Sequence, residues 1–322
     1  MTLVKISNFT KNFGTTTAVH RLSLDIQEGE IFGLVGPDGA GKTTAIRLML
    51  GILTPDSGDG SIGDYDLRRD AQLVSTLTGY VSQRFSLYPE LTVRENLELF
   101  ADIYGVPDRE RMPRLQRLMQ FSRLEPFRDR LARNLSGGMK QKLALSCALI
   151  HTPKVLFLDE PTTGVDPLSR RDLWRLLFDL WQEGVTIVVS TPYMDEAERC
   201  SRVGFLSQGR LIALGAPEQL RQKFRGAIFE IFSDDKFEAR SIVERLPFVT
   251  DVNVFGAGLH TTVAPSANLT AEAEIRSAFE SASHPVTAIQ RIEPSMEDVF
   301  FQITGGAVNG KRNGNSAVKY QR

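Results

Sequence analysis

One stretch decides the fold of this chain: Gly36-Pro37-Asp38-Gly39-Ala40-Gly41-Lys42-Thr43-Thr44. It follows an apolar run at residues 31–35, which is typical of a buried strand, and it precedes residues 45–50, whose apolar spacing predicts a helix. A strand, a glycine-rich turn and a helix in this order are the context of a phosphate-binding loop. The alternative is an ordinary glycine-rich turn of an α/β domain, which the lysine and the two threonines disfavour.

The residue types in this stretch suit a phosphate group. Glycines allow the backbone to curl so that successive N–H groups point inward, and the following helix adds the positive end of its dipole. Lys42 is expected to reach the outer phosphates as a point charge, and the Thr43 hydroxyl is expected to ligate Mg²⁺.

Length and composition limit the class of protein. The chain has 322 residues, which predicts about two domains, and its 42% hydrophobic and 24% charged residues are typical of a globular chain. A formal net charge of -1 gives no basic footprint, so no nucleic-acid partner is expected. Cys147 and Cys200 lack metal-ligand spacing and are expected to be reduced, buried thiols. No signal peptide and no apolar run of roughly 20 residues is found, so membrane contact is expected only through partners.

Before the central part of the chain, strands are expected at residues 4–9 and 22–26, and residues 54–60 are expected to form a turn. Residues 78–83 predict a strand that ends in Gln83.

Residues 84–150 are expected to form a mostly helical insert in the α/β core. Thr92 and Glu95 are spaced as a capping box at the start of one helix. Pro107 and Pro113 are expected to interrupt the helical pattern.

The second informative stretch, residues 134–142, reads NLSGGMKQK and leads into a strongly apolar helix. A serine and two glycines at a helix N-terminus leave free amides that suit an anion. The same residues are also an ordinary N-cap, so this motif alone is a weak signal.

The third stretch, residues 154–160, reads KVLFLDE and predicts a central strand with two carboxylates at its carboxyl end. Ligands bind at that end of an open α/β sheet. Adjacent side chains of a strand point in opposite directions, so Asp159 and Glu160 are expected to have different roles unless the strand has already ended. Asp159 is suited to hold Mg²⁺, and Glu160 is suited to orient and deprotonate a water. The alternative is a solvated strand end, which the upstream phosphate loop disfavours.

The rest of the chain predicts two architectures. A turn at residues 161–167, a helix at 172–182, a strand at 185–191 and a hairpin at 203–213 complete a mostly parallel sheet. After about residue 224, the expected order of elements is β-α-β-β-α-β, which matches a small ferredoxin-like sandwich. A closing helix is expected at residues 296–303, and the basic segment 305–322 is expected to be a flexible tail.

Taken in order, the motifs GPDGAGKTT, LSGGMKQK and VLFLDEP resemble those of the nucleotide-binding subunits of ABC transporters. The resemblance covers roughly residues 3–224 and is closest to the ATPases of drug-resistance exporters, which act with separately encoded permeases. It implies an α/β P-loop cassette at residues 1–224, with antiparallel N-terminal strands and the helical insert. A small α+β accessory domain follows at residues 225–304.

The resemblance also assigns residues to roles. ATP is expected to lie against Phe13, which stacks on adenine, and against Val19 and the stretch Gly36 to Thr44. Glu160 and Gln83 are the expected catalytic residues, and Thr43, Gln83 and Asp159 are expected to hold Mg²⁺. Asp166 is expected in a loop that crosses a dimer interface. The segment expected to contact ATP held by an opposite subunit consists of Leu135, Ser136, Gly137, Gly138 and Met139.

The mechanism that the resemblance implies needs partners. Two cassettes are expected to face head to tail and trap two ATP molecules, and hydrolysis is expected to open this dimer. Motion is then expected to pass to an integral membrane permease at the cytoplasmic face of the membrane. The residues expected in the permease contact, unless they belong to the insert core, are Phe85, Leu87, Tyr88 and Leu91.

One departure from the family pattern bears on activity. Where the family has a histidine after a strand, residues 190–197 read STPYMDEA, with Pro192 at the histidine position. Proline has neither a side-chain donor nor a backbone N–H. We therefore expect this ATP site to turn over slowly and a partner with an intact histidine to supply most turnover. Asp38 is a milder departure, where asparagine is common, and its side chain is expected to point outward.

Two other readings stay open at this point. One is a regulatory ATP-binding module with almost no catalysis, which Pro192 makes plausible. The other is a soluble ABC ATPase that acts on ribosomes or DNA, which the neutral charge and the single cassette disfavour.

Overall fold

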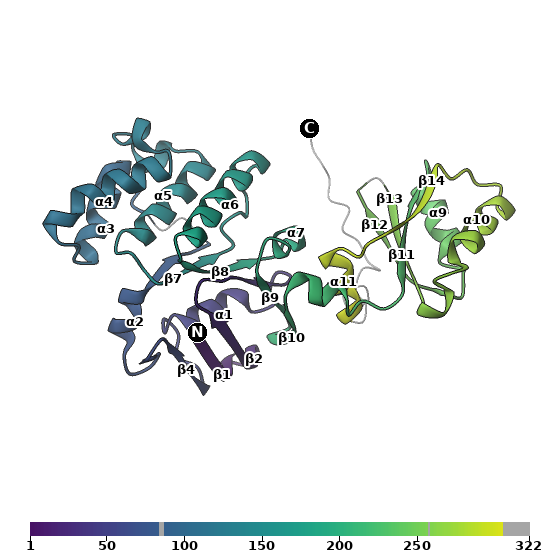
Figure 1. Ribbon diagram of the computed structural model, residues 1–322, viewed down its shortest axis with the longest axis horizontal. Helices are drawn as coiled ribbons and strands as arrows, with labels where there is room; N and C mark the ends of the chain where they lie inside the picture. Colours follow the sequence, from purple (N-terminus) through teal and green to yellow (C-terminus); the bar gives the residue numbers. More distant parts are fainter. Residues whose placement is uncertain (84–86, 257, 305–322) are drawn as a thin grey trace. The chain divides into compact units, whose positions relative to one another are not determined.

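A computed structural model of the chain describes residues 1–83, 87–256 and 258–304. The chain divides into two compact units, the first at residues 1–217 and the second from residue 218 onward (Figure 1). The predicted tail at 305–322 and the predicted permease-contact residue Phe85 lie outside the described residues. The expected domain limits at residues 224 and 304 stay predictions.

A six-stranded sheet forms the centre of the first unit, in the order β10-β9-β3-β8-β7-β6. Its strands are parallel except for β10, which pairs antiparallel with β9. Strands β3, β7 and β8 are buried along their whole length, as expected for a parallel sheet covered on both faces. The strands are β3 (Ile31–Val35), β6 (Thr78–Val81), β7 (Val155–Asp159), β8 (Thr186–Thr191), β9 (Arg202–Ser207) and β10 (Arg210–Gly215).

A second, antiparallel sheet in the order β2-β1-β4-β5 confirms the predicted N-terminal strands, although they are longer than expected. The predicted turn at residues 54–60 is wrong in its second half, because β4 begins at Ser57. Gly60 is a packing glycine within this strand: a Cβ there would lie 2.7 Å from the ring of Phe9. The strands are β1 (Thr2–Phe13), β2 (Thr16–Gln27), β4 (Ser57–Ile62) and β5 (Tyr65–Asp66).

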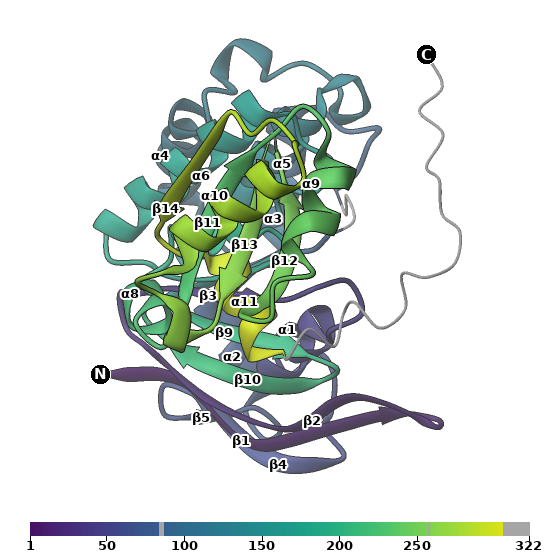
Figure 2. The same cartoon turned by 90° about the vertical axis from the view of Figure 1, so that its right-hand side faces the viewer.

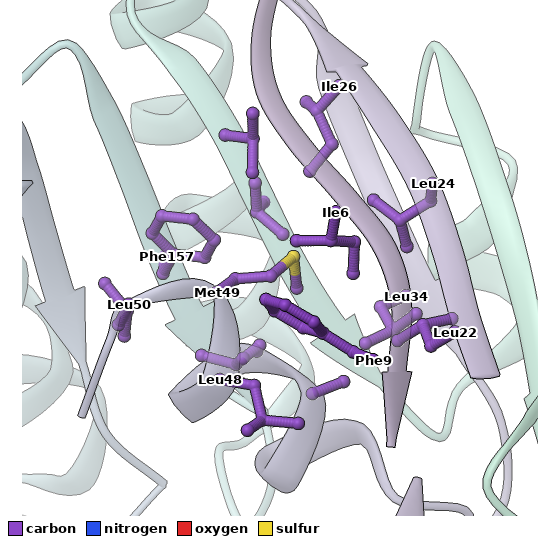
Figure 3. Packing of buried hydrophobic residues seen from close by; sticks show 14 of the residues in the cluster. Ile6, Phe9, Leu22, Leu24, Ile26, Leu34, Leu48, Met49, Leu50 and Phe157 are labelled. Carbon is purple, nitrogen blue, oxygen red and sulfur yellow. The ribbon is translucent and has the colours of Figure 1, made fainter. Parts of the chain in front are cut away.

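The core of this unit lies between the two sheets and helix α1 (Lys42–Met49) (Figure 3). Apolar residues alternate along β1 and β2, and their inward side chains pack on α1 and on β3 and β7. Figure 3 shows Phe9 beside Met49 and Leu34 at the centre of this cluster. The loop before α1 is thereby attached to a rigid base.

Helices α3, α4, α5 and α6 lie together on one side of the central sheet, whereas α7 lies beside β3 and β8 (Figure 1). The capping box of Thr92 and Glu95 at α3 is confirmed. The expected interruption at Pro113 is wrong, because this residue lies inside α4, where Leu115 and Met119 bury their side chains in the core of the insert. The helices are α2 (Ala71–Leu77), α3 (Val93–Ile103), α4 (Asp108–Phe121), α5 (Gly137–Leu149), α6 (Pro167–Gln182) and α7 (Met194–Ala197).

The expected start of α6 at residue 172 is five residues late. The helix begins at Pro167, whose fixed φ suits the first helical position, and the Asp166 side chain caps it by accepting from the Ser169 N–H at 2.9 Å. Both cysteines are buried free thiols, as expected. No helix in the described part of the chain is long and apolar enough to cross a membrane.

The second unit confirms the ferredoxin-like prediction. Its sheet has the order β12-β13-β11-β14, all antiparallel, and α9 and α10 pack on it (Figure 2). Helix α8 (Pro217–Arg221) leads into this unit. Its elements are β11 (Ala227–Phe232), α9 (Lys236–Val243), β12 (Val249–Phe255), β13 (Gly258–Val263), α10 (Ala271–Ser281), β14 (Ala288–Ile292) and α11 (Met296–Ile303).

A buried charge pair connects β13 with α11 in this unit. His260 Nδ1 lies 3.3 Å from Asp298 Oδ1, and both side chains are only 6% exposed. The hydrogen bond to Asp298 raises the pKa of His260 above its ordinary value of about 6.5, although burial acts against it. Burial acts to raise the pKa of Asp298, but hydrogen bonds from His260 and Ser295 outweigh it and hold that pKa below its ordinary value. The neighbouring carboxylates Glu230 and Glu297 also favour the charged imidazole.

The second unit should therefore be most stable at mildly acidic pH. Because the pKa of His260 is raised by folding, its contribution is complete below about pH 6.5 and is lost as the pH rises through the raised value. The contribution of Asp298 is lost only as the pH falls through its lowered pKa. We expect a loss of about 1–2 kcal/mol on the alkaline side, measured as hydrogen-exchange protection of residues 227–303 corrected for intrinsic rates. An unchanged alkaline profile in His260→Gln would contradict this assignment.

Candidate functional site

The glycine-rich stretch leaves the carboxyl end of β3 and enters α1, as predicted. Gly39 and Gly41 have φ values of 77° and 100°, in the left-handed region that favours glycine. A Cβ at Gly41 would lie 2.3 Å from the carbonyl oxygen of Ala18, so this position also requires close backbone approach. The loop is thus held between α1 and the start of β2.

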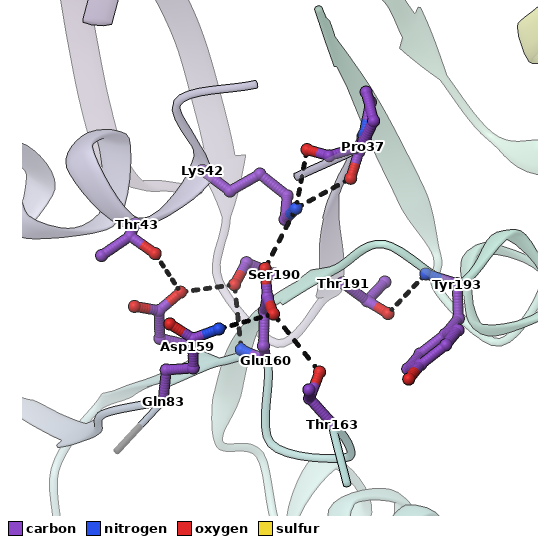
Figure 4. A network of polar contacts seen from close by, with 11 residues as sticks. Pro37, Lys42, Thr43, Gln83, Asp159, Glu160, Thr163, Ser190, Thr191 and Tyr193 are labelled. Atoms are coloured by element: carbon purple, nitrogen blue, oxygen red, sulfur yellow. Dashed lines mark hydrogen bonds and ion pairs between the residues drawn. The ribbon is translucent and has the colours of Figure 1, made fainter. Parts of the chain in front are cut away.

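Lys42 lies beneath the loop with its ammonium group among oxygen atoms (Figure 4). Nζ donates to the carbonyl oxygens of Gly36 at 2.8 Å and Pro37 at 3.1 Å, and it lies 3.0 Å from Glu160 Oε1. The side chains of Lys42 and Glu160 are 3% and 7% exposed, so this is a buried ion pair.

Asp159 ends β7, is fully buried, and collects hydroxyl groups. Oδ1 accepts from Ser190 Oγ at 2.7 Å and from Thr43 Oγ1 at 3.1 Å, and Oδ2 faces the hydroxyl of Tyr80 at 3.4 Å. Burial raises the pKa of Tyr80, so its hydroxyl stays protonated. A hydroxyl and a carboxylate that meet in this way are the oxygen donors that Mg²⁺ prefers.

These oxygen donors fit Mg²⁺, but they would supply only a few of the ligands in its coordination shell. In the described part of the chain, no group of three or more His, Cys, Asp and Glu side chains could hold a metal ion. Mg²⁺ keeps several waters and takes the remaining ligands from substrate phosphates in such sites.

Glu160 faces the same loop as its neighbour Asp159. The strand ends at Asp159, and Glu160 has a φ of 49°, in the left-handed region, so the alternation of the strand does not continue. Glu160 Oε2 accepts from Gln83 Nε2 at 2.9 Å and from Thr163 Oγ1 at 3.3 Å. Such backbone conformations are costly for non-glycine residues and are concentrated at functional sites.

A cavity of about 420 Å³ opens beside the loop. Gly39, Gly41, Lys42, Thr43, Thr44 and Glu160 line it, and all of them are predicted site residues. Four further lining residues were not predicted: Thr16, Thr17, Ala18 and Gln208. The sequence could not indicate this role for Gln208, because it depends on a distant contact of the same hairpin, in which Gly209 N–H donates to Ala40 O at 3.0 Å.

Two residues expected at the nucleotide, Phe13 and Val19, do not line this cavity. Val19 is fully buried in the core between the sheets, so its side chain faces away from the cavity. Phe13 is 51% exposed at the end of β1, with Lys11 Nζ 5.8 Å from its ring centroid. Its ring is accessible, although Phe13 is not among the described residues that line the cavity. Asp38 is exposed.

The Ser-Gly-Gly segment begins α5, where Ser136 Oγ caps the helix by accepting from the Met139 N–H at 3.4 Å. Leu135 is buried, whereas a Cβ at Gly137 would meet open space. A Cβ at Gly138 would lie 2.6 Å from Ser169, so this glycine allows α5 and α6 to approach. The described residues that line the cavity beside Lys42 include none of this segment and not Asp166.

Pro192 follows the last residue of β8, at the same edge of the sheet as the loop. Gly36 N–H donates to Thr191 O at 3.2 Å, and Tyr193 N–H donates to Thr191 Oγ1 at 3.0 Å. The segment is therefore in contact with the loop, but residue 192 supplies no donor.

Comparisons with known proteins agree with this geometry. Residues 19–163 match the family described as ABC transporter, and residues 215–304 match the C-terminal domain of DrrA1-3-like ATP-binding proteins. The chain is 42% identical over 293 residues to a probable multidrug ABC transporter ATP-binding protein, YbhF, of Escherichia coli K12, covering 90% of this chain but 50% of that protein. It therefore spans half the length of that relative. It is 36% identical over 307 residues to a Nod factor export ATP-binding protein I of Rhizobium etli, covering 95% of this chain and 94% of that protein.

Solved structures are similar to about two thirds of this chain. One, described as an ATP binding subunit of an ABC transporter, has a TM-score of 0.64 and 31% identity and covers 69% of this chain and 93% of its own. Another is a dimeric cassette, MJ0796, in a post-hydrolysis state with ADP and Pi, with a TM-score of 0.61 and 28% identity. It covers 66% of this chain and 98% of its own.

The buried ion pair of the site has a consequence for stability. Replacing Lys42 with methionine leaves the carboxylate of Glu160 buried without its cation, which should cost about 3–5 kcal/mol of unfolding free energy. Urea unfolding of Lys42→Met, Glu160→Gln and the double variant measures this cost. The double variant should regain most of the loss, and equal instability of Lys42→Met and the double variant would contradict the pairing.

Proposed function

Because the chain belongs to the family of ABC transporter ATP-binding proteins, we propose that it binds and hydrolyses ATP to drive export of small molecules through separate membrane subunits. Similarity to proteins named for multidrug transport and Nod factor export supports the class of transport. The proposal places the protein at the cytoplasmic face of the membrane as a peripheral subunit.

The observation that carries the proposal is the convergence of three groups at one end of the central sheet. Lys42 lies beneath a loop of amides, Thr43 meets Asp159, and Glu160 faces the same cavity. A phosphate chain beside the loop would accept hydrogen bonds from the loop amides and from the Lys42 ammonium. In the structure, this ammonium donates to the carbonyl oxygens of Gly36 and Pro37. These are the parts that phosphoryl transfer needs, because its catalysis is mostly positioning and charge stabilisation.

Each residue then has a defined task. Thr43 and Asp159, with Gln83 beside them, would hold Mg²⁺, which neutralises phosphate charge when it is bound. Glu160 orients a water and accepts its proton. Gln83 and Thr163 hold the second carboxylate oxygen of Glu160, which fixes the direction of the first. Phe13, with its exposed ring, offers a stacking surface for adenine.

The site also needs a second cassette in this proposal. The Ser136 to Gly138 segment has helix N-terminal amides but lies outside the cavity of its own chain. A head-to-tail pair would place it against the phosphates held by the other cassette, and the dimer of the similar MJ0796 supports such pairing. Among the expected permease contacts, Leu87 is buried in the insert core, which favours the structural alternative for it, whereas Tyr88 is 50% exposed.

Pro192 sets the expected rate of the site. It stands where a side-chain donor would contact the phosphates, and it has none. We propose slow turnover here and a partner cassette with an intact histidine. The same observation favours a second candidate, a regulatory module with almost no catalysis; action on nucleic acid has no such support in the charge balance.

The binding half of the proposal is tested with a fluorescent ATP analogue. The wild-type chain should bind it, and Lys42→Met should weaken binding about 10- to 100-fold because a charged hydrogen bond to phosphate is lost. Lys154→Met is a matched control, since this exposed lysine lies at the opposite end of β7. Equal affinity of all three proteins would contradict the site.

The catalytic half is tested by restoring the donor. Pro192→His should raise ATP turnover roughly 100-fold, the effect of one well-placed donor in a transition state. Pro192→Ala is the control, because it removes the proline without adding a donor. The proline does not limit the rate if Pro192→His is no faster than Pro192→Ala and if adding Glu160→Gln to Pro192→His does not lower its ATP turnover. Measurement with a partner cassette whose own site is disabled separates the active subunit from the regulatory module.

A further inference from the structure

The segment that carries Pro192 is attached to α6 by a buried contact. Glu196 of α7 is fully buried, and its Oε1 accepts from Arg170 Nε at 2.6 Å and from Trp174 Nε1 at 3.0 Å. Both donors come from α6. The carboxylate therefore connects the short α7 to the long helix behind it.

Arg170 makes two further contacts with the same segment. Its Nη2 donates to both carboxylate oxygens of Asp195, at 2.9 and 3.1 Å, and its guanidinium lies 4.4 Å from the ring centroid of Tyr193. One arginine thus contacts three of the four residues from 193 to 196. We call Arg170, Tyr193, Asp195 and Glu196 the Arg170 clamp.

The Arg170 clamp is continuous with the phosphate loop. Tyr193 N–H donates to Thr191 Oγ1, Thr191 O accepts from Gly36 N–H at 3.2 Å, and Gly36 O accepts from Lys42 Nζ at 2.8 Å. Figure 4 shows the Tyr193 ring directed away from Lys42, so the segment reaches the loop through its backbone and the Thr191 side chain. Displacement of the segment would shift the first residue of the loop.

The first turn of α6, which carries Arg170, also lies at the parts of the molecule that would face a second cassette. Asp166 caps its first turn, and Ser169, next to Arg170, packs against Gly138 of the Ser-Gly-Gly segment. Lys142 of α5 and Asp172 of α6 lie 3.8 Å apart. Arg170 therefore stands between the Ser-Gly-Gly segment and the phosphate loop of the same chain.

We propose that Arg170 is a positioning residue, which fixes residues 191–196 on α6 and thereby sets the geometry of the phosphate loop and of Glu160. The inference rests on the proposed function. It follows from Pro192: a histidine could be held in place by the bound phosphate, but a proline offers no side-chain contact, so the segment depends on the clamp. Glu160 N–H donates to Ser190 at the end of β8, which brings the catalytic carboxylate under the same control.

Arg170→Lys tests this role while keeping a cation beside buried Glu196. A lysine cannot reproduce the fork to Asp195 or the planar contact with Tyr193. We expect kcat, counted per titrated nucleotide site of the full chain, to fall about tenfold, with the Kd for ATP changed less than about threefold. Asp195→Asn, which leaves every buried charge paired, should lower kcat about threefold. Arg175→Lys is the matched control, because Arg175 of the same helix is exposed, pairs with Asp172 at 3.5 Å and should not change kcat.

A double-mutant cycle separates positioning from folding. If Arg170 acts through the segment, Arg170→Lys should cost at least about fivefold less in a Pro192→His background, where bound phosphate can hold the segment. The inference would be overturned if the effects of Arg170→Lys and Pro192→His simply multiply, or if Arg170→Lys and Asp195→Asn both keep the wild-type kcat. The proposed function would still stand in that case, provided that the chain binds ATP in a way that depends on Lys42. A chain that binds no ATP would refute the proposed function and this inference with it.

Discussion

The structure depends on one buried pair of opposite charges, the ammonium of Lys42 and the carboxylate of Glu160. Neither charge can be buried alone at a tolerable cost, so each requires the other and the polar groups around both. The ammonium donates to carbonyl oxygens of the loop, and the carboxylate accepts hydrogen bonds from the amide of Gln83 and the hydroxyl of Thr163. An arriving phosphate would compete for the same ammonium and would release the carboxylate toward a water. In the proposed mechanism, one ion pair therefore holds the empty site together and prepares the catalytic base.

Three ends of parallel strands bring this pair together. β3 delivers the loop, β7 delivers Asp159 and Glu160, and β8 delivers Ser190 and Thr191, all at the carboxyl edge of one sheet. The strands are buried on both faces and fixed in register, so the side chains just beyond them have little freedom. The antiparallel sheet and α1 supply the second side of the core, and Gly41 allows the loop to approach the start of β2. The precision of the site is thus a property of the sheet and not of the loop alone.

Much of this was predictable because its signals are local. The loop, the capping box at Thr92, the N-cap at Ser136 and the buried strands each need only neighbouring residues to be recognised. Other features were missed because they depend on distant contacts. Gly60 resembled a turn residue until the ring of Phe9 was known to occupy the space of its Cβ, and Gln208 reaches the cavity only because its hairpin bonds to Ala40. Pro113 was expected to break a helix that packing of the insert core preserves.

The left-handed conformation of Glu160 was not predicted for another reason, which is that no neighbouring glycine indicates it. It arises where β7 ends and the Glu160 N–H bonds to Ser190 of the adjacent strand. The conformation allows two adjacent carboxylates to face the same loop, Asp159 at Thr43 and Glu160 at Lys42, which a continuing strand would forbid. In the proposed mechanism, a chain that accepts this cost at Glu160 yet has proline at position 192 keeps the base in position and lacks the donor opposite it. Within that proposal, the combination favours a site that holds ATP over one that cleaves it rapidly.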